Sequence, residues 1–227
     1  MWQLYKYQPV NKLVLSNLSH GKLWFSQPDA FNDPFEFRLQ RKKEVKGIVV
    51  LREQNPHLSN LSDEKIIGIA TEKYEHEIRS MGVACFTELP NNIQMWSYYA
   101  DSHKGICLGF CGKNENKSKN DSGLYKVGYE SDYPELTFSD IWHKEGLAKI
   151  LWTKEKEWRH EKEWRQIQVE GNKLVDYISY NLNKIISGLR TSEIDRNLIR
   201  CVVSDKVEFL QVRRHNTSYK LEIIPAT

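Results

Sequence analysis

The segment 154–170, KEKEWRHEKEWRQIQVE, constrains the fold most, because it contains the pentapeptide EKEWR twice, six residues apart. Around the first copy, apolar residues recur at helical spacing, which predicts a helix over 139–158. Around the second copy, side chains alternate, which predicts a strand over 163–170. The chain therefore changes from helix to strand within a few residues, and we expect an α+β protein. The predicted helical stripe consists of Leu147, Ile150, Leu151, Lys154 and Trp158.

The predicted strand has one unusual face. Side chains alternate along a strand, so this face carries Glu161, Glu163, Arg165, Ile167 and Val169. The isoleucine and valine favour the core, so the charged residues are expected at the edge of the core, where a cleft would lie. Charged groups are costly there unless they are paired or used. The face therefore predicts either part of a functional site or a structural network of ion pairs.

The rest of the chain also mixes the two kinds of element. With 227 residues it is long enough for a large core. We expect a single α+β domain over 1–227, with central mixed or antiparallel sheets flanked by helices. Strands are predicted at 2–8, 22–26, 82–88, 106–110 and 124–130, followed by a hairpin over 207–225. Further helices are predicted at 11–21, 63–79 (with Ser62 as N-cap) and 177–189, and residues 192–203 are predicted to be helical or mixed.

Composition excludes some classes of protein. No apolar run is long enough to span a membrane, and the N-terminus lacks a signal-peptide pattern, so we expect a cytoplasmic protein without membrane contact. The net charge of +3 neither predicts nor excludes nucleic-acid binding. The four cysteines form no CxxC pair and there is no HExxH, so no metal site is expected. The polar segment 113–123 predicts a surface loop.

Three clusters mix polar residues with large aromatics, at 4–7, 23–37 and 95–110, and this is the usual composition of a pocket. Each has a structural alternative: an Asx-turn in the second cluster, core anchors and a surface histidine in the third. The candidate binding residues are Tyr5, Lys6, Tyr7, Ser26, Asn32, Asp33, Trp96, Tyr99 and Arg165, and the candidate catalytic residues are Glu163, Glu161 and His103.

These residues carry a resemblance to a family. LYKY, LxxGxLxFSxPxxFNDPFE, CFTE, MWSYYADSHKGICLGF and KxxxWxxExEWR occur here in this order. The chain resembles the bacterial family known as domain of unknown function 2971, from residue 4 to about residue 223. Members are often found among bacterial defence genes, so the resemblance implies a role in phage defence or abortive infection.

A looser resemblance is to ADP-ribosyltransferase toxins, some of which modify nucleic acids. Those proteins have an early strand with a polar residue, then a Tyr or Ser that helps hold nicotinamide, and a late strand with a catalytic Glu, often as ExE. The resemblance implies an ADP-ribosyltransferase-like fold and NAD as substrate. It places Lys6 and Tyr7 in the first strand, Ser26 after the second, and Glu161 and Glu163 in the last. Lys6 or Tyr7 departs from the His or Arg that is usual at the first position.

In this interpretation Glu163 stabilises positive charge that develops on the ribose. Tyr7 and Tyr99 stack on nicotinamide, and Lys6 and Arg165 hold the pyrophosphate. The acceptor is a nucleic acid, RNA or single-stranded DNA, or a protein. Two alternatives stay open: a nuclease or other hydrolase that uses His103 and Glu163, and a non-enzymatic sensor or binding module of a defence or toxin–antitoxin complex.

Overall fold

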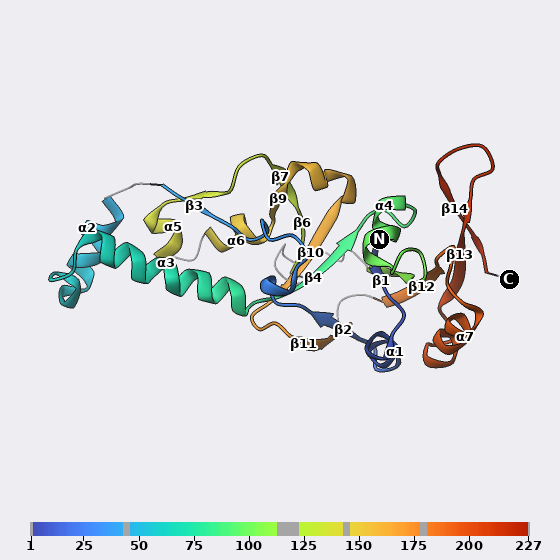
Figure 1. Ribbon diagram of the computed structural model, residues 1–227. Helices are drawn as coiled ribbons and strands as arrows, with labels where there is room; N and C mark the ends of the chain where they lie inside the picture. The colour runs from blue at the N-terminus through green and yellow to red at the C-terminus, as the bar shows by residue number, and fades with distance from the viewer. Residues whose placement is uncertain (1, 43–45, 113–122, 143–145, 178–180, 227) are drawn as a thin grey trace.

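The computed structural model describes residues 2–42, 46–112, 123–142, 146–177 and 181–226. Its centre is a mixed eight-stranded sheet in the order β14-β13-β12-β5-β1-β4-β10-β6 (Figure 1). The described strands of this sheet pair antiparallel, except β12 and β13, which pair parallel. The strands are β1 Trp2–Gln8, β4 Gly82–Thr87, β5 Ile106–Gly112, β6 Leu124–Lys126, β10 Glu163–Gln168, β12 Asn181–Ser187, β13 Glu208–Arg214 and β14 Leu221–Pro225. The predicted α+β class is confirmed.

The sheet separates between β1 and β4. On one side, β1 pairs with β5 along its whole length, from Trp2 to Gln8. On the other side, β4 pairs with β10 along its whole length, from Gly82 to Thr87. Within the described strands, β1 and β4 themselves pair at Tyr5 and Thr87 alone. The two halves of the sheet are thus joined at one point and diverge beyond it.

Three two-stranded sheets and the helices surround this sheet. The small sheets pair β2 Lys22–Phe25 with β11 Lys173–Asp176, β3 Gln40–Arg41 with β8 Glu135–Leu136, and β7 Gly128–Glu130 with β9 Thr153–Glu155. The α-helices are α1 Lys12–Ser19, α2 Lys46–Gln54, α3 Asp63–Ser80, α4 Ile93–Tyr99, α5 Phe138–Trp142, α6 Gly146–Leu151 and α7 Glu193–Val202. Short 3₁₀ helices are η1 Pro28–Ala30, η2 Pro56–Leu58 and η3 Lys156–Glu161.

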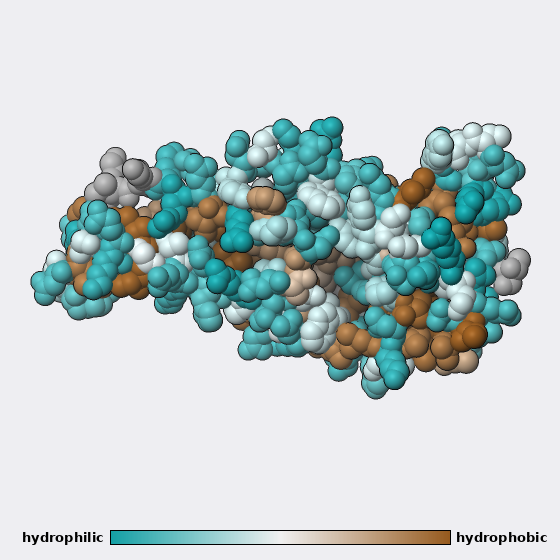
Figure 2. Space-filling view, viewed as in Figure 1, coloured by the Kyte–Doolittle hydropathy of each residue, from teal (hydrophilic) through white to brown (hydrophobic). Residues whose placement is uncertain are grey.

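The molecule is elongated, with α2 and α3 at one end and the β13–β14 hairpin at the other (Figure 1). Three hydrophobic clusters fill it: one under α3, α5 and α6, and two on the strands of the large sheet. Figure 2 shows a mostly hydrophilic face with apolar patches near α1 and α7, where Leu13, Ile194 and Leu198 are exposed. No helix among the described residues is long and apolar enough to cross a membrane. That residues 1–227 form one domain stays a prediction.

Local signals predicted many elements correctly. Ser62 caps α3 through its side chain, as expected, and Gly21 follows α1 with φ of +62°. The strand over 2–8, the helix over 193–202 and the C-terminal hairpin are confirmed. The predicted loop 113–123 lies outside the described residues except for its last position.

Two predicted helices are wrong. The helix over 139–158 is broken: α6 ends at Leu151, β9 follows, and η3 carries Trp158. Lys154 leaves the helical stripe because its ammonium group contacts buried carboxylates. In the second case, residues 181–187 form strand β12 where 177–189 was expected to be helical. Three consecutive residues at its end are buried, which is typical of a strand covered on both faces.

The expected orientation of the charged strand face is also wrong. Arg165 is fully buried, with 0% of its surface exposed, whereas Val169 lies beyond the end of β10 and is 82% exposed. Glu161 belongs to η3 rather than to the strand. The charged end of the face therefore lies inside the protein, where its charges must be paired.

Candidate functional site

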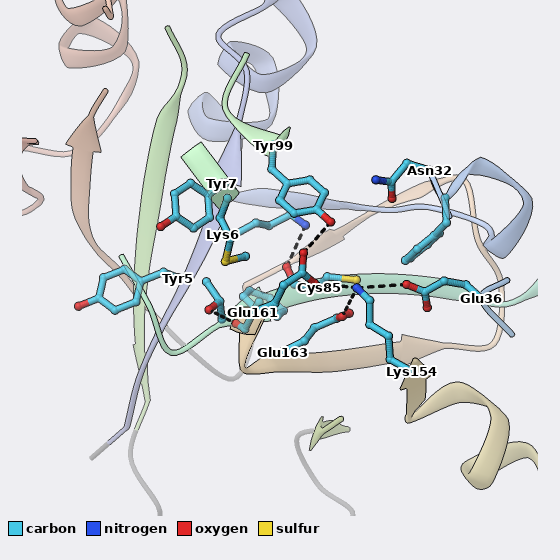
Figure 3. A pocket seen from close by; sticks show the side chains of 14 residues that line it. Tyr5, Lys6, Tyr7, Asn32, Glu36, Cys85, Tyr99, Lys154, Glu161 and Glu163 are labelled. Carbon is cyan, nitrogen blue, oxygen red and sulfur yellow. Dashed lines mark hydrogen bonds and ion pairs between the residues drawn. The ribbon is translucent and has the colours of Figure 1, made fainter. Parts of the chain in front are cut away.

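A pocket lies where β1 and β4 diverge (Figure 3). Its walls combine aromatic rings with charged side chains. We call it the carboxylate pocket, and it is lined by Tyr5, Lys6, Tyr7, Phe31, Asn32, Glu36, Cys85, Phe86, Thr87, Met95, Tyr99, Lys154, Glu161 and Glu163.

Lys154 is the centre of the charged wall. Its Nζ lies 2.7 Å from Oε2 of Glu161, 2.8 Å from Oε2 of Glu163 and 3.2 Å from Oε1 of Glu36. Figure 3 shows these side chains converging on the ammonium group. The ammonium group also lies 4.9 Å from the centre of the Trp158 ring, within the range of a cation–π interaction. One buried cation thus holds three carboxylates together.

Arg165 holds two of the same carboxylates from behind the pocket. Its Nε donates to Oε1 of Glu163 at 2.7 Å, and its Nη2 donates to Glu36. Its Nη1 donates to the carbonyl of Leu151 at 2.9 Å, and the ring of Phe37 lies 4.9 Å from the guanidinium carbon. Arg165 does not line the pocket, so the expectation that it holds a pyrophosphate is wrong. It positions Glu163 instead.

The turn between η3 and β10 brings the two carboxylates of ExE to one place. Residues i and i+2 share a face only within a strand, and Glu161 is not in the strand. Lys162 adopts a left-handed conformation, with φ of +46°, which turns the chain between them. The Thr87 hydroxyl donates to the carbonyl of Glu161, and the Tyr99 hydroxyl donates to Oε1 of Glu161 at 2.8 Å. The turn at Lys162 therefore places the Glu161 and Glu163 carboxylates together, although the sequence predicted that a straight strand would do so.

A row of residues crosses the point where the sheet halves meet. Tyr5 pairs with Thr87, and Thr87 pairs with Glu163, across β1, β4 and β10. Paired residues of adjacent strands point to the same face, so these three side chains belong to one surface. Glu163 is therefore fixed by the backbone of three strands as well as by its ion pairs.

Lys6 occupies the opening between the two strands. Its Nζ donates to the carbonyl of Cys85 at 3.1 Å, and it lies 5.7 Å from the centre of the Phe86 ring. If β1 and β4 continued to pair, a backbone amide would donate to this carbonyl. Because the strands diverge here, the ammonium group of Lys6 donates to it instead. Burial lowers the pKa of Lys6, although Cys85 and Glu163 act against this.

The pKa values of two of the carboxylates are shifted in opposite directions. Burial disfavours ionisation of Glu163, but Arg165 and Lys154 outweigh it and lower its pKa to about 2. Burial raises the pKa of Glu36, although the same two cations counter it. Burial likewise disfavours the ammonium form of Lys154, yet Glu163, Glu36 and Glu161 raise its pKa. Environments that push the pKa values of neighbouring carboxyls apart are typical of sites that assign them different roles.

The cluster has an excess of negative charge. Three carboxylates bond to two cations, so one negative charge is left over when all three are ionised. Among the described residues, no group of three or more His, Cys, Asp or Glu side chains is arranged to hold a metal ion. The Lys6 ammonium group, which also lines the pocket and interacts with Glu163, offsets this charge in the pocket as a whole. Oriented carboxylates beside aromatic rings suit a flat or developing cation.

The pocket is small. It offers about 100 Å³ to the centres of water molecules. One water needs roughly 10–15 Å³ of such space, so the pocket has room for a single small ring and not for a dinucleotide. The remainder of a larger ligand would lie outside its mouth.

The structure brings together some of the predicted site residues. The carboxylate pocket contains Tyr5, Lys6, Tyr7, Asn32, Tyr99, Glu161 and Glu163. Ser26 lies elsewhere and forms backbone hydrogen bonds with Val83. Asp33 accepts a hydrogen bond from the Phe35 amide at 2.9 Å, which is the Asx-turn alternative. Trp96 is fully buried, and its indole donates to the carbonyl of Pro90, as a core anchor does.

His103 lies in a different cavity from Glu163. Its ring stacks on one side of Trp96, at 6.1 Å between ring centres, while Tyr7 packs edge-on against Trp96 at 5.0 Å. Asp101, Ser102 and His103 all have positive φ, which is unusual for residues other than glycine. The motif MWSYYADSHKG therefore begins in α4 and ends in a strained turn, and Trp96 contacts both His103 and Tyr7, which line different cavities.

Sequence reasoning missed Lys154 and Glu36 as site residues. Both belong to motifs that were recognised, KxxxWxxExEWR and FNDPFE. The sequence pattern places Lys154 on a helical stripe, and it gives Glu36 no role beyond membership of the polar-aromatic cluster 23–37. One signal in the sequence could have revealed Lys154. The predicted strand face carries two carboxylates, Glu161 and Glu163, but only one cation, Arg165, so burial of both carboxylates requires a further cation from elsewhere in the chain.

One family model matches part of the chain. Residues 95–166 match the family described as "Protein of unknown function (DUF2971)", which confirms the resemblance over this part of the chain. The matched segment contains β5 and β9 and most of α4 and β10, and thus Tyr99, Lys154, Glu161 and Glu163. No curated protein and no solved structure matches the chain. The looser likeness to ADP-ribosyltransferases is therefore not supported by any relative.

Proposed function

We propose that the chain transfers ADP-ribose from NAD to an acceptor, a nucleic acid or a protein, with the carboxylate pocket as its active site. One observation carries this proposal. Glu163 is an ionised carboxylate on the wall of a pocket lined by tyrosines, and Lys154 and Arg165 hold it in place. A charge that is already oriented stabilises a developing cation without reorganising during the reaction.

In the proposed reaction, the bond between the ribose C1′ and the nicotinamide nitrogen breaks. The electron pair of that bond leaves with nicotinamide, whose positive ring becomes neutral, and the ribose acquires oxocarbenium character. Glu163 stabilises that charge. A lone pair of the acceptor then forms the new bond to C1′, and the proton of the acceptor passes to Glu161 or to water.

The size of the pocket supports this placement of NAD. The nicotinamide ring fits the available space, between Tyr7 and Tyr99, and the rest of the dinucleotide extends from the mouth. Lys6 is the cation of the pocket that would meet a pyrophosphate oxygen. A role as a toxin in phage defence or abortive infection, with a defence or antitoxin partner, rests on the family resemblance alone.

The test is incubation of the purified protein with NAD labelled in its ADP-ribose part. Single-stranded DNA, RNA and cell lysate are supplied as acceptors in separate reactions. We expect label to enter one of these pools and nicotinamide to be released. Glu163→Gln should lower the rate by about 10²–10³, the usual effect of losing one preorganised electrostatic contact.

Glu36→Gln is the matched control. It removes a carboxylate from the same two cations, Lys154 and Arg165, but not the carboxylate assigned to the ribose, so it controls for the loss of one buried ion-pair partner. The rate should fall far less in Glu36→Gln. Equal activity of Glu163→Gln and the wild type would refute the transferase proposal.

A binding module is the second candidate, and one observation favours it. Both oxygens of Glu163 already accept hydrogen bonds within the protein. A pocket whose carboxylate already accepts hydrogen bonds at both oxygens would bind a cationic ring without reacting with it. Saturable binding of NAD or nicotinamide, with no release and no transfer in any pool, would support this candidate.

A further inference from the structure

A second cavity lies at the turn of the β13–β14 hairpin, and His103, which stacks on Trp96, is part of its wall. We call it the basic cavity. Its volume is about 590 Å³, against about 100 Å³ for the carboxylate pocket. Its charged and titratable lining residues are Arg190, Arg214, Lys220, His103 and His215, and none of the described lining residues is acidic.

The backbone brings these cations together from three segments. The Arg190 amide donates to the carbonyl of His103 at 2.9 Å, so the loop after β12 lies against the turn after α4. A side chain at Gly188 would collide with the same carbonyl, so this close approach depends on glycine. His215 and Lys220 flank the hairpin turn, where their backbones are hydrogen-bonded at 2.9 Å.

The arginines and the lysine of the basic cavity have no counter-charge among the described residues, whereas the His215 imidazole lies 3.9 Å from a carboxylate oxygen of Glu222. In the part of the chain that the structure describes, no carboxylate lies within ion-pair distance of Arg190, Arg214 or Lys220. Strand alternation explains this for Arg214, because its neighbour Arg213 points to the opposite face and pairs with Glu222 at 2.6 Å. Burial lowers the pKa of His103, and the charges of Arg190 and Arg214 lower it further. A bound polyanion would remove this repulsion.

Side chains suited to bases lie beside the cations. Tyr219 is 100% exposed at the tip of the hairpin, next to Lys220. It lines both the basic cavity and an adjoining shallow pocket, which Asn91 and Gln94 also line. Aromatic rings stack on unpaired bases, and exposed amides bond to base edges. A ligand that consisted of phosphate alone would need the cations of the basic cavity but not Tyr219.

One short segment of the chain contributes to both cavities. The Tyr7 hydroxyl donates to the carbonyl of Leu89 at 2.7 Å, and in the residues that follow, Ile93 lines the basic cavity while Met95 lines the carboxylate pocket.

From these observations we infer that the basic cavity binds a single-stranded nucleic acid, with phosphates on Arg190, Arg214 and Lys220 and a base on Tyr219. The inference rests on the proposed function only in naming this strand as the acceptor. Binding itself requires neither NAD nor Glu163.

The test measures fluorescence anisotropy of labelled single strands of about twelve nucleotides, in RNA and DNA form, without NAD and at several salt concentrations. Arg214→Glu/Lys220→Glu should weaken binding at least tenfold. The slope of log affinity against log salt should fall by about 0.7 for each lost phosphate contact. Binding of either strand supports the proposal, and the tighter one names the natural ligand.

Lys65→Glu/Lys73→Glu is the matched control. It changes the net charge equally, but on exposed residues of α3 at the opposite end of the molecule (Figure 1). It should leave affinity within about twofold. Tyr219→Ala should cost about tenfold and Tyr219→Phe much less, because stacking needs the ring and not the hydroxyl.

Three results would overturn the inference: no binding by the wild type, equal weakening in the control, or equal affinity for heparin with no effect of Tyr219→Ala. Tighter binding of duplex than of single strands would overturn it as well. Transfer of label is measured separately. Strand binding that persists in Glu163→Gln while transfer is absent in every variant would leave the cavity supported and the transferase refuted.

Discussion

The carboxylate pocket and the basic cavity both gather charged side chains, but they are built in opposite ways. In the first, carboxylates and cations are buried and paired with one another. In the second, cations are exposed and face no carboxylate among the described residues that line it. Buried charges must be paired at short distance because desolvation is costly, whereas exposed like charges are screened by water and salt.

The comparison shows what each arrangement is suited to do. Paired buried charges fix the orientation of Glu163, which is what electrostatic stabilisation of a reacting group requires. Unpaired exposed charges attract a charged partner over a distance and release counterions when it binds. The first cluster should therefore matter for stability and chemistry, and the second for association.

Lys154→Met should have the largest effect on stability. It leaves three buried carboxylates with only Arg165 as a cationic partner, so the free energy of unfolding should fall by about 3–5 kcal/mol. Urea unfolding followed by circular dichroism measures this. Lys156→Met, which changes an exposed lysine nearby, should stay within about 0.5 kcal/mol. A loss below about 1 kcal/mol for Lys154→Met would show that the cluster is not a network of buried ions.

Glu163→Gln and Glu36→Gln should differ in stability although they touch the same cations. The pKa of Glu163 is lowered to about 2, so the fold favours its charged form, and an amide there should cost about 2–3 kcal/mol at neutral pH. Burial raises the pKa of Glu36, so the fold tolerates its neutral form, and an amide there should cost less than about 1 kcal/mol. Activity assays therefore belong well below the unfolding temperature.

The same pair predicts the dependence of stability on pH. The folded pKa of Glu163 lies below its ordinary value of 4.5, so its contribution is complete above pH 4.5 and is lost as the pH falls toward 2. The contribution of Glu36 to stability changes with pH in the opposite direction, because a raised pKa in the folded state means that protonation favours folding. Unfolding measured between pH 6 and pH 2 should thus be less steep for Glu163→Gln than for the wild type. If the stability of Glu163→Gln and of the wild type fell equally steeply with pH, the lowered pKa of Glu163 would be contradicted.

Arg214→Gln should have the smallest effect on stability, within about 0.5 kcal/mol, because this exposed arginine has no ion pair among the described residues. Its effect should instead appear at His103, whose pKa should rise when a nearby positive charge is removed. NMR titration of the imidazole measures this. Arg213→Gln removes a paired arginine from the opposite face and should leave the pKa of His103 unchanged.

Local patterns predicted much of the fold. Period-two alternation, the cap at Ser62 and the turn at Gly21 depend on near neighbours in the chain, and the elements that they indicate are present. The two wrong helices, over 139–158 and 177–189, depend on distant contacts. Lys154 leaves its helix to reach buried carboxylates, and β12 is a strand because β5 and β13 pair with its two edges.

The candidate site was predicted in its residue types and not in its construction. Glu161 and Glu163 do share one wall, but through a left-handed turn at Lys162 rather than through the strand. His103 was grouped with them because its motif is polar and aromatic, yet Trp96 contacts both His103 and Tyr7, which line different cavities. Spacing in the sequence cannot show which cavity a side chain lines.

By itself the sequence determined the α+β class, most strands, the cap at Ser62 and the concentration of charge around 154–165, because these depend on periodicity and on neighbouring residues. The tertiary structure decided which charges meet. The divergence of β1 from β4 opens the pocket, and residues far apart in the chain, Glu36, Lys154 and Arg165, close its charged wall. The reason is desolvation. A buried charge is stable only where the folded chain supplies its partner, so the pairing of these charges depends on the tertiary structure.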